Sequence, residues 1–512
     1  MKKPLFIFLT LLLFLNLHSQ QWQWAKSFNL LGSYLTEDKL AIDNNSNSYL
    51  TGNIYTLGAV ILKVDSVGNE IWRKYISGNL SITGICTKDN IVYVCGNFKG
   101  QFTVNNFTLN SSVSNDIFLL SLNGNGTILW IKTFGGSGYD AANDITIANN
   151  FIYLTGSYNG TLSANGYTVN GAGTKNMFYS KHDLSGNLTF LKSASASDST
   201  SWSGGQKIRV YNDKIYILGI QNYKMMIDTF HIDSYYHGYY DSNFLCKLES
   251  LGKPEFLKQI GEGIEELTEI VVNPDESFST CGWSAWHGSY PVAYAYNSMG
   301  KRQNFTYVAG TCYGDAGYFR SMINAGSDLF AFGDRAHGGN CIQPVSSHTL
   351  ILAKYSPTLT RLYLDTIRSF GKITGSNISK CSNGDFIVSG QLINGWIKIG
   401  QDSIYTTGEG LFIAKFKDAS IQSIKENKFK ESIFDVYPNP SKGIFTIVYK
   451  ANEQNPIIIT LKNQLGQTIL TNQYPEQKEL KEIFDLSRLA KGVYFIQVNT
   501  DQATEIRKII TE

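Results

Sequence analysis

The chain has 512 residues with a formal net charge of +2, 17% charged residues and 13% aromatic residues. This near-neutral balance excludes the basic footprint that a nucleic-acid-binding protein needs, and the length predicts at least two domains or one repeat array. Glycine (47) far exceeds proline (10), and aromatic and small polar residues are plentiful, which is typical of a β-rich extracellular protein.

The first twenty residues have the pattern of a secretory signal peptide. Lys2 and Lys3 precede an apolar run at residues 5–17, and Ser19 is a suitable small residue before a cleavage site. The run is too short to span a bilayer, and no later segment approaches the length of a transmembrane helix. We therefore expect residues 1–20 to be removed; the alternative is a buried helix of the mature protein.

Residues 21–420 contain a repeated strand that ends in glycine and follows a turn rich in Asn, Asp and Gly. Seven copies occur, ending at Gly52, Gly96, Gly156, Gly219, Gly282, Gly333 and Gly390. An upstream strand precedes each turn, and a second signature follows each copy, as at Ile61–Trp72 and Leu119–Trp130. Each unit thus supplies four strands, which predicts an all-β, seven-bladed β-propeller. A long sandwich or solenoid fits the repeat spacing less well.

The two ends of this array complement each other. The last unit stops at residues 411–420 without the strand that closes the other units, whereas Trp24–Phe28 parallels Trp130–Phe134. We expect the N-terminal strand to complete the last blade and close the ring, because closure removes exposed sheet edges.

The repeats resemble a bacterial β-propeller repeat family, and the unit from Trp130 to Gly156 fits its pattern best. The later units depart from the pattern. That family implies a scaffold and no particular chemistry. The segment Asp65–Trp72 is superficially similar to the Asp-box of sialidases, but its spacing differs, and turn chemistry with a packed aromatic explains it better.

The chain continues through a charged linker at residues 421–432 into a small domain at residues 433–512. Alternating residues predict strands at 444–449, 457–462, 467–471 and 493–498, which suits a small immunoglobulin-like β-sandwich. Two motifs precede a basic ending, and their principal residues are Tyr437, Pro438, Asn439, Pro440, Gly443, Gly492 and Tyr494.

These motifs resemble the type A C-terminal sorting domain of the type IX secretion system of Bacteroidetes-type bacteria. The resemblance implies passage through the periplasm, recognition by the type IX machinery, and a secreted or outer-surface location. It also implies that the sorting domain is usually removed, with the protein released or attached to surface lipopolysaccharide.

The variable loops and the starts of the inner strands should share one face around the central opening. Candidate ligand-binding residues on that face are Tyr235, Tyr236, His237, Tyr239, Trp283, Trp286, His287 and His337. Aromatic rings with polar tips suit a glycan or a peptide. The bland alternative is a tyrosine-rich insertion that packs over its own blade. Asp228, His231, Asp233 and His237 have no specific metal-ligand spacing, so we expect neither a metal nor a cofactor.

Signatures of catalysis are weak, and no catalytic residue is assigned. Asp140, Asp144, Glu265, Glu266 and Asp315 are the carboxylates that the topology would bring near the axis. The favoured hypothesis is a binding or adhesion module for extracellular glycan or protein. The alternatives are a carbohydrate-active hydrolase or lyase with axial carboxylates, and a structural surface component. Seven cysteines leave disulfide pairing open, with Cys86 and Cys95, and Cys312 and Cys341, as candidate pairs.

Overall fold

The computed structural model describes residues 21–30, 34–196, 198–234, 241–261, 265–285, 290–308, 316–336, 348–418, 434–463, 467–500 and 504–512. Every regular element in these ranges is a β-strand, and every strand pairing is antiparallel, which confirms the all-β prediction. None of the described residues forms a helix that could cross a membrane. The chain divides into two compact units, Met1–Ile421 and Gln422–Glu512.

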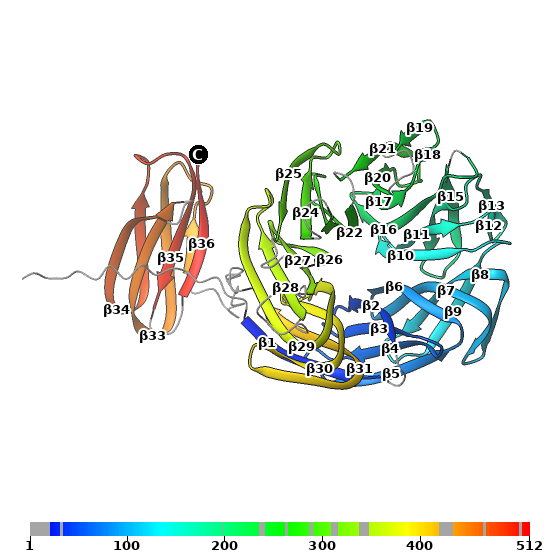
Figure 1. The fold of residues 1–512 in the computed structure, drawn as a ribbon. Coiled ribbons are helices and arrows are strands. Elements are labelled where there is room, and N and C mark those ends of the chain that lie inside the picture. The colour runs from blue at the N-terminus through cyan, green and yellow to red at the C-terminus, as the bar shows by residue number, and fades with distance from the viewer. Residues whose placement is uncertain are drawn as a thin grey trace, which may run out of the picture. The chain divides into compact units, whose positions relative to one another are not determined.

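The first unit is a ring of four-stranded sheets around a central opening (Figure 1). Sheet 1 contains β2 (Leu35–Ile42), β3 (Ser48–Ile54), β4 (Gly58–Val64) and β5 (Glu70–Ser77). Sheet 2 contains β6 (Leu80–Lys88), β7 (Ile91–Val104), β8 (Phe107–Asn123) and β9 (Ile128–Phe134). Sheet 3 contains β10 (Ala141–Ala148), β11 (Phe151–Tyr158), β14 (Asn176–Asp183) and β15 (Leu188–Ala196), with the hairpin β12 (Thr161–Ala164) and β13 (Tyr167–Asn170) inserted.

The remaining sheets follow in chain order. Sheet 4 contains β16 (Ser203–Tyr211), β17 (Lys214–Gln221), β20 (Ser242–Leu248) and β21 (Pro254–Ile260), and its inserted hairpin is β18 (Lys224–Ile227) and β19 (Phe230–Asp233). Sheet 5 contains β22 (Glu265–Val272), β23 (Phe278–Ser284), β24 (Tyr290–Tyr296) and β25 (Arg302–Tyr307). The last strands are β26 (Ala316–Ala325), β27 (Asp328–Ala336), β28 (His348–Tyr355), β29 (Arg361–Lys380), β30 (Phe386–Ile399), β31 (Asp402–Lys417) and β1 (Gln21–Asn29).

Strand β29 belongs to two sheets. Its first part pairs with β28 up to Arg368, and its second part pairs with β30 from Ser369 onward. We therefore name β26, β27, β28 and the first part of β29 sheet 6, and the second part of β29 with β30, β31 and β1 sheet 7. In sheet 7, β1 pairs with β31 from Gln21, opposite Lys417, to Asn29, opposite Gly410.

Each repeated glycine lies in the second strand of a sheet, and at six of the seven the backbone of the neighbouring inner strand comes unusually close. A Cβ added to Gly156 would lie 1.9 Å from the carbonyl oxygen of Ala141. The corresponding distance from Gly390 to the carbonyl oxygen of Thr374 is also 1.9 Å. The sequence interpretation placed the end of the strand at this glycine, but the strands continue past it, as β11 does to Tyr158. The glycine therefore serves close backbone approach, not strand termination.

Replacement of one such glycine should destabilise the first unit. We expect Gly156→Ala to cost about 1–3 kcal/mol, because the new methyl group must displace backbone atoms of β10. Gly408→Ala is a matched control, since an added Cβ there meets nothing within 4 Å. Chemical denaturation of both variants checks this, and an unchanged midpoint for Gly156→Ala would contradict the proposed close approach.

The sheets pack face to face through buried apolar clusters. Tyr49 and Ile61 of sheet 1 share one such cluster with Val92 and Phe118 of sheet 2. Outer strands add a second, repeated contact with the next sheet, because the ring of Trp72 lies over Gly126 in the turn between β8 and β9. The Nε1–H group of Trp72 also donates to the Gly124 carbonyl oxygen at 3.1 Å. The same aromatic-on-glycine contact recurs in the pairs Trp24 with Gly68, Trp130 with Gly186, and Phe190 with Gly252.

The second unit is a five-stranded sheet arrangement with its own core. Its strands are β32 (Phe434–Tyr437), β33 (Ile444–Asn463), β34 (Thr468–Asp485), β35 (Gly492–Asn499) and β36 (Thr504–Thr511). The predicted strands at 444–449 and 457–462 are one continuous strand, β33, which pairs with β32, β34 and β35. The second half of β34 and all of β36 were missed, because alternation is weak in these charged segments.

Candidate functional site

Irregular pairing on the inner strands exposes one residue of each sheet to the central opening. In six of the seven sheets, a register shift leaves an unpaired residue just before this position, as between Ala142 and Asp144 in β10. Such bulges re-aim side chains. The seven residues that pair with the residue before each repeated glycine are Lys39, Gly84, Asp144, Lys207, Glu269, Ser321 and Asn377. All seven line one cavity of about 280 Å³.

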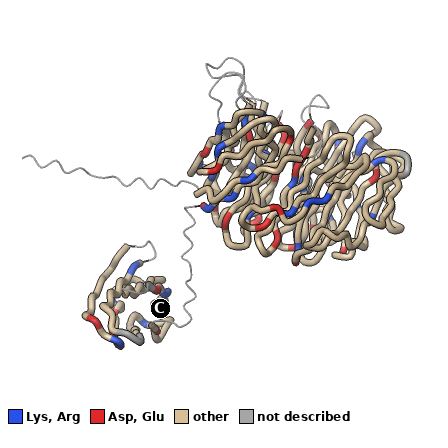
Figure 2. Tube along the Cα trace, turned by 90° about the horizontal axis from the view of Figure 1, so that it is seen from below, with Lys and Arg blue, Asp and Glu red and all other residues tan. Residues whose placement is uncertain are grey.

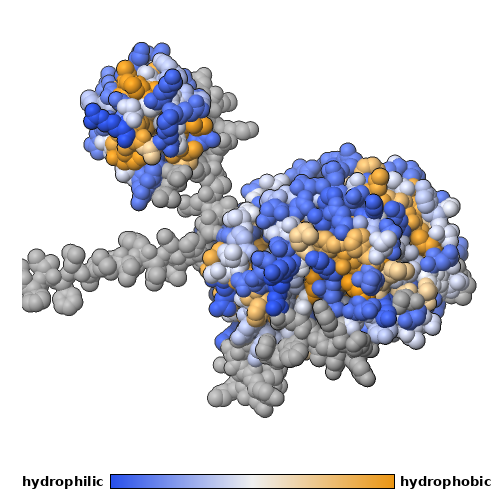
Figure 3. Space-filling model, turned by 90° about the horizontal axis from the view of Figure 1, so that it is seen from above, coloured by the Kyte–Doolittle hydropathy of each residue, from blue (hydrophilic) through white to orange (hydrophobic). Residues whose placement is uncertain are grey.

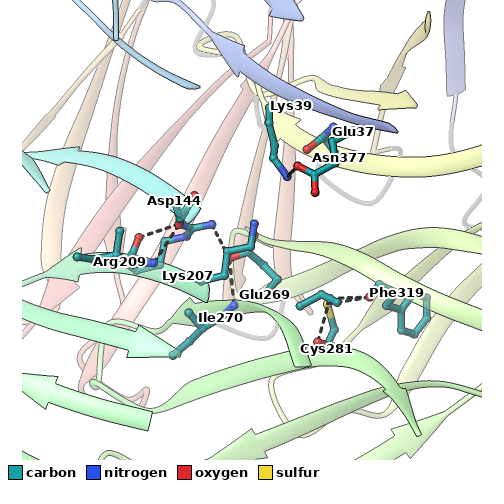
Figure 4. A network of polar contacts seen from close by, with 12 residues as sticks. Glu37, Lys39, Asp144, Lys207, Arg209, Glu269, Ile270, Cys281, Phe319 and Asn377 are labelled. Atoms are coloured by element: carbon teal, nitrogen blue, oxygen red, sulfur yellow. Dashed lines mark hydrogen bonds and ion pairs between the residues drawn. The ribbon is translucent and has the colours of Figure 1, made fainter. Parts of the chain in front are cut away.

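A charge network crosses this cavity (Figure 4). The guanidinium of Arg209 bridges two carboxylates, with Nη1 2.6 Å from Asp144 Oδ2 and Nη2 2.5 Å from Glu269 Oε1. Lys207 Nζ lies 3.9 Å from Glu269 Oε2, and the backbone amide of Ile208 donates to Asp144 Oδ2 at 2.9 Å. Sheets 3, 4 and 5 are therefore joined by one partly buried ionic network.

These pairings fix the protonation states of the network. Burial alone would raise the pKa of Asp144, but Arg209 and Lys207 outweigh burial and hold that pKa below its ordinary value. The carboxylates likewise outweigh the burial of Arg209 and raise the pKa of its guanidinium. Asp144 and Arg209 are therefore both charged at neutral pH, and their charges compensate each other. This favours a structural role for the network over proton transfer.

A larger cavity of about 530 Å³ opens beside this network. Its lining combines opposite charges, namely Glu37, Asp38, Glu266, Glu269 and Glu409 with Lys39, Lys207, Arg320 and Lys372. Charges of both signs are also interspersed over the first unit as a whole (Figure 2). Among the described residues, no ion pair involves Lys372, whereas Arg320 Nε lies 2.8 Å from Asp334 Oδ1. The cavity thus offers both donors and acceptors to a polar ligand.

Asp38 is the most deeply buried carboxylate of the large cavity. Its oxygens accept from Ser376 Oγ at 2.5 Å and Asn377 Nδ2 at 2.9 Å, and Gln391 Nε2 contributes a longer contact of 3.3 Å. Burial raises the pKa of Asp38, while these hydrogen bonds and Lys39 oppose the increase. Asp38 joins β2 to β29 and β30, and its raised pKa makes it the strongest candidate proton carrier in this cavity.

Trp283 is the only predicted ligand-binding residue within the described part of the chain. It is half-buried beside the large cavity, and its Nε1–H group donates to Glu266 Oε2 at 3.2 Å. Its ring meets Tyr318 edge to face with centroids 5.5 Å apart. The other predicted ligand-binding residues lie outside the described residues, namely Tyr235, Tyr236, His237, Tyr239, Trp286, His287 and His337.

The predicted axial carboxylates do not form one group. Asp144 and Glu266 line the cavities, whereas Glu265 is buried and accepts from the Tyr294 hydroxyl. Asp140 is buried at the start of sheet 3, where burial raises its pKa to about 7 while the amides of Gly136 and Asn159 oppose the shift. Asp315 lies outside the described residues.

The described hairpin of the tyrosine-rich insertion, β18 and β19, extends sheet 3, because Met226 pairs with Ser195 and Met225 with Ala196 of β15. The hairpin also packs on its own sheet, since Met225 shares a buried apolar cluster with Ile217 and Phe244 of sheet 4. Within the described residues, no group of His, Cys, Asp and Glu side chains has the arrangement of a metal site. The described cysteines, Cys86 and Cys95 included, are free thiols, whereas Cys312 and Cys341 lie outside the described residues.

Sequence reasoning missed most of the residues that line the cavities, among them Glu37, Lys39, Lys207, Arg209 and Lys372. A usable signal existed, because these residues lie on the strands just upstream of the repeated turns. Alignment of the inner strands on the repeated glycines, with a difference of one residue allowed in the intervening hairpin, would have placed Lys39, Asp144, Lys207 and Glu269 at one common position. The bulges made this correspondence hard to recognise, because each adds one residue that interrupts the alternation of polar and apolar residues along the strand.

In the second unit, the predicted motif residues come together at one end. Asn439 holds the opening turn to the last strand, since its Nδ2 donates to the Lys508 carbonyl at 2.7 Å and its Oδ1 accepts from the Ile510 amide at 2.9 Å. Gly443 has φ +93° and lies against Ser487, where a Cβ would clash at 2.8 Å. The hydroxyl of buried Tyr494 donates to the Ala490 carbonyl oxygen at 2.5 Å.

The comparison with protein families matches this second unit. Residues 435–512 match the family described as "Secretion system C-terminal sorting domain". This match confirms the sorting-domain part of the sequence prediction. It points to export by the type IX secretion machinery to the cell surface or the extracellular space.

Three solved structures resemble the chain distantly. No curated protein matches the chain. A polysaccharide lyase of family PL25, an ulvan lyase bound to -[GlcA(1-4)Rha3S]-, aligns at 9% identity and a TM-score of 0.42, over 74% of this chain and 97% of that chain. A protein of unknown function from Dyadobacter fermentans aligns at 7% identity and a TM-score of 0.37, over 78% and 99%. The Saccharomyces cerevisiae core factor aligns at 8% identity and a TM-score of 0.36, over 77% of this chain but only 59% of that chain.

Proposed function

We propose that the mature chain is an exported seven-bladed β-propeller that binds an extracellular glycan or protein at its axial cavity. In this proposal, residues 1–20 are a signal peptide, residues 21–420 form the propeller closed by β1, and residues 421–432 link it to the immunoglobulin-like sorting domain. The type IX machinery exports the protein through recognition of that domain. The protein is then released or attached to surface lipopolysaccharide.

The single observation that carries the binding role is the large cavity of about 530 Å³ at the centre of the ring. Sheets from opposite sides of the ring contribute to its lining, including Lys39 of β2 and Lys207 of β16. A polar cavity of this volume suits a ligand that presents several hydroxyl, carboxylate or amide groups. A purely structural surface component would have no use for such a cavity, which favours binding over that alternative.

The first experiment is a glycan and polysaccharide array with the secreted protein, scored for both retention and release of new sugar ends. Retention without release supports a binding module, and release supports an enzyme. If the array shows neither retention nor release, the search turns to protein ligands, and capture from the surface of co-resident cells is the next measurement.

Variants of the cavity rim should weaken retention of a ligand found in this way. We expect Trp283→Ala and Glu266→Gln each to reduce affinity about tenfold, because each removes one partner of a rim contact that the ligand would meet. Tyr167→Ala is the control, since its ring is exposed on β13 away from the cavity lining. Equal affinity of wild type and both rim variants would place the ligand elsewhere.

A carbohydrate-active enzyme is the second candidate, favoured by Asp38. A buried carboxyl group with a raised pKa is a candidate general acid, and the side chains of Glu37 and Glu409 line the same cavity. Asp38→Asn would abolish release of sugar ends in that case. Loss of retention together with release would instead indicate that Asp38 holds the fold.

A further inference from the structure

Three aromatic side chains form a row across sheet 7. Phe370 of β29 lies directly opposite Trp396 of β30, and Trp396 lies directly opposite Tyr405 of β31. Residues opposite each other in antiparallel strands project from the same face. Their exposed fractions are 61%, 51% and 65%, so all three rings face solvent. We name these three residues the aromatic row.

The opposite face of the same strands is buried. Ile397 and Ile399 of β30 and Ile404 of β31 belong to the apolar core that sheets 6 and 7 share. The hairpin of β30 and β31 therefore packs on the core through its isoleucine side chains. The aromatic row contributes nothing to that core. Single exposed apolar residues are ordinary, but adjacent ones in register mark interaction sites. Apolar residues do gather among polar ones on one face of the first unit (Figure 3).

The geometry of the row selects an extended ligand. Adjacent strands are about 4.8 Å apart, close to the length of one sugar residue in an extended polysaccharide. Three rings in line on an exposed sheet surface suit an extended polysaccharide chain better than a compact ligand. Aromatic rings stack on flat faces of C–H groups, and the Trp and Tyr tips hydrogen-bond at the edges. A pyranose ring presents both such a face and such edges.

Basic residues run along one side of the aromatic row. Arg368 lies two residues before Phe370, and Lys398 lies two residues beyond Trp396 on the antiparallel partner strand, so both are on the same side. Both are exposed, and within the described ranges neither forms an ion pair. Lys398 lies opposite Ser403. Positive charge beside a stacking surface complements a chain that carries carboxylate or sulfate groups.

The aromatic row is connected to the axial cavity through the same three strands. Lys372, Ile393 and Glu409 line the large cavity and pair with one another across β29, β30 and β31. Between them and the row, the register shifts at Gly371, whose φ is +105°, and at the facing Gly395. Bulges bend strands and re-aim side chains, and this one separates the cavity-lining residues from the aromatic row.

We propose that the aromatic row binds an extended acidic polysaccharide, with its sugar faces stacked on Phe370, Trp396 and Tyr405 and its anionic groups at Arg368 and Lys398. This deepens the proposed function by naming the substrate class, and it rests on that function only in assuming an extracellular glycan. The aromatic row holds the polysaccharide, while the axial cavity receives one part of the same polysaccharide.

The test uses the full secreted chain in affinity electrophoresis through gels that contain polygalacturonate, dextran sulfate or neutral dextran. We expect Trp396→Ala/Tyr405→Ala to weaken retention by an acidic polymer at least about tenfold. Arg368→Ala/Lys398→Ala should weaken retention by acidic polymers. It should also make retention less dependent on salt concentration, since binding then releases fewer counterions. Comparison of retention by polygalacturonate with retention by dextran sulfate distinguishes recognition of carboxylate groups from recognition of sulfate groups. Tyr167→Ala is the aromatic control, and thermal melting verifies that each variant is folded.

A second measurement needs no variant. Bound polysaccharide should protect Trp396 from oxidation by N-bromosuccinimide, as read by peptide mass spectrometry of the wild-type chain. Retention unchanged in the aromatic variant, or Trp396 oxidised equally with and without polymer, would overturn the row as a binding site. If the rim variants at Trp283 and Glu266 still lost retention, the axial proposal would stand. No retention of any of these polymers by wild type would overturn the row and leave the axial proposal to the glycan array.

Discussion

Removal of residues 21–28 should abolish cooperative unfolding of the first unit or lower its midpoint by about 5–10 °C. These residues are most of β1, which covers the edge of β31 and places Ala25 and Phe28 in buried positions. Their loss removes several kcal/mol of apolar burial, and for a domain of this size each kcal/mol shifts the midpoint by about 2–4 °C or less. Differential scanning calorimetry of the secreted chain with and without the segment measures the effect.

Point variants separate the role of packing from that of chain length. Phe28→Ala should cost about 3–5 kcal/mol because it empties a buried aromatic site. Gln23→Ala is a matched control in the same strand, since Gln23 is exposed and lies in the register irregularity of β1. A truncated chain that melts as cooperatively as wild type would refute ring closure by β1.

Replacement of Arg209 by alanine should destabilise the first unit by about 3–5 kcal/mol. The substitution leaves Asp144 and Glu269 as poorly compensated carboxylates in the inner cavity, because Arg209 contacts both. Urea unfolding at neutral pH measures the cost. Arg361→Ala, at an exposed position of β29, is the control for loss of one positive charge and should have little effect.

The effect of Arg209→Ala should also depend on pH. The folded-state pKa of Asp144 is lowered, so its contribution is present above the ordinary carboxyl pKa and is lost as pH falls through the folded value. The difference between wild type and variant should therefore shrink in acid. A triple variant Arg209→Met/Asp144→Asn/Glu269→Gln should recover part of the stability at neutral pH. A difference that stayed constant from neutral to acid pH would show that lost packing, not charge, explains the cost.

Local patterns in the sequence predicted the elements well where turn chemistry is explicit. Asp65 illustrates this, because its carboxylate accepts from the amides of Val67 and Asn69, and Gly68 adopts φ +94° in the same turn. Each residue type has a local reason to be there. The aromatic that follows was also correctly interpreted as packed, although the sequence did not indicate that Trp72 packs on the next sheet.

The site could not be predicted in the same way, because its residues acquire their roles only through non-local pairing. Nothing near Lys39 or Lys207 distinguishes it from a lysine on a solvated strand. Their common position follows from pairing with the second strand and from a bulge, and both depend on the assembled sheet. The sequence analysis instead chose residues by composition, in aromatic loops, and of these only Trp283 falls within the described chain.

The contact between an outer-strand aromatic and the glycine turn of the following sheet has a consequence for how such a ring could grow. Trp72 and Gly126, or Trp130 and Gly186, are the two halves of one joint, and the segment between these two joints contributes one glycine and one aromatic residue. A duplicated sheet would therefore bring its own glycine for the preceding sheet and its own aromatic residue for the following sheet. It could thus be inserted between two existing sheets. The joint formed by Trp24 and Gly68 connects sheet 7 to sheet 1, and Trp24 belongs to β1, which pairs with β31, the last strand of the ring. The number of repeats is therefore decided in sheet 7, where the first and last strands of the ring meet.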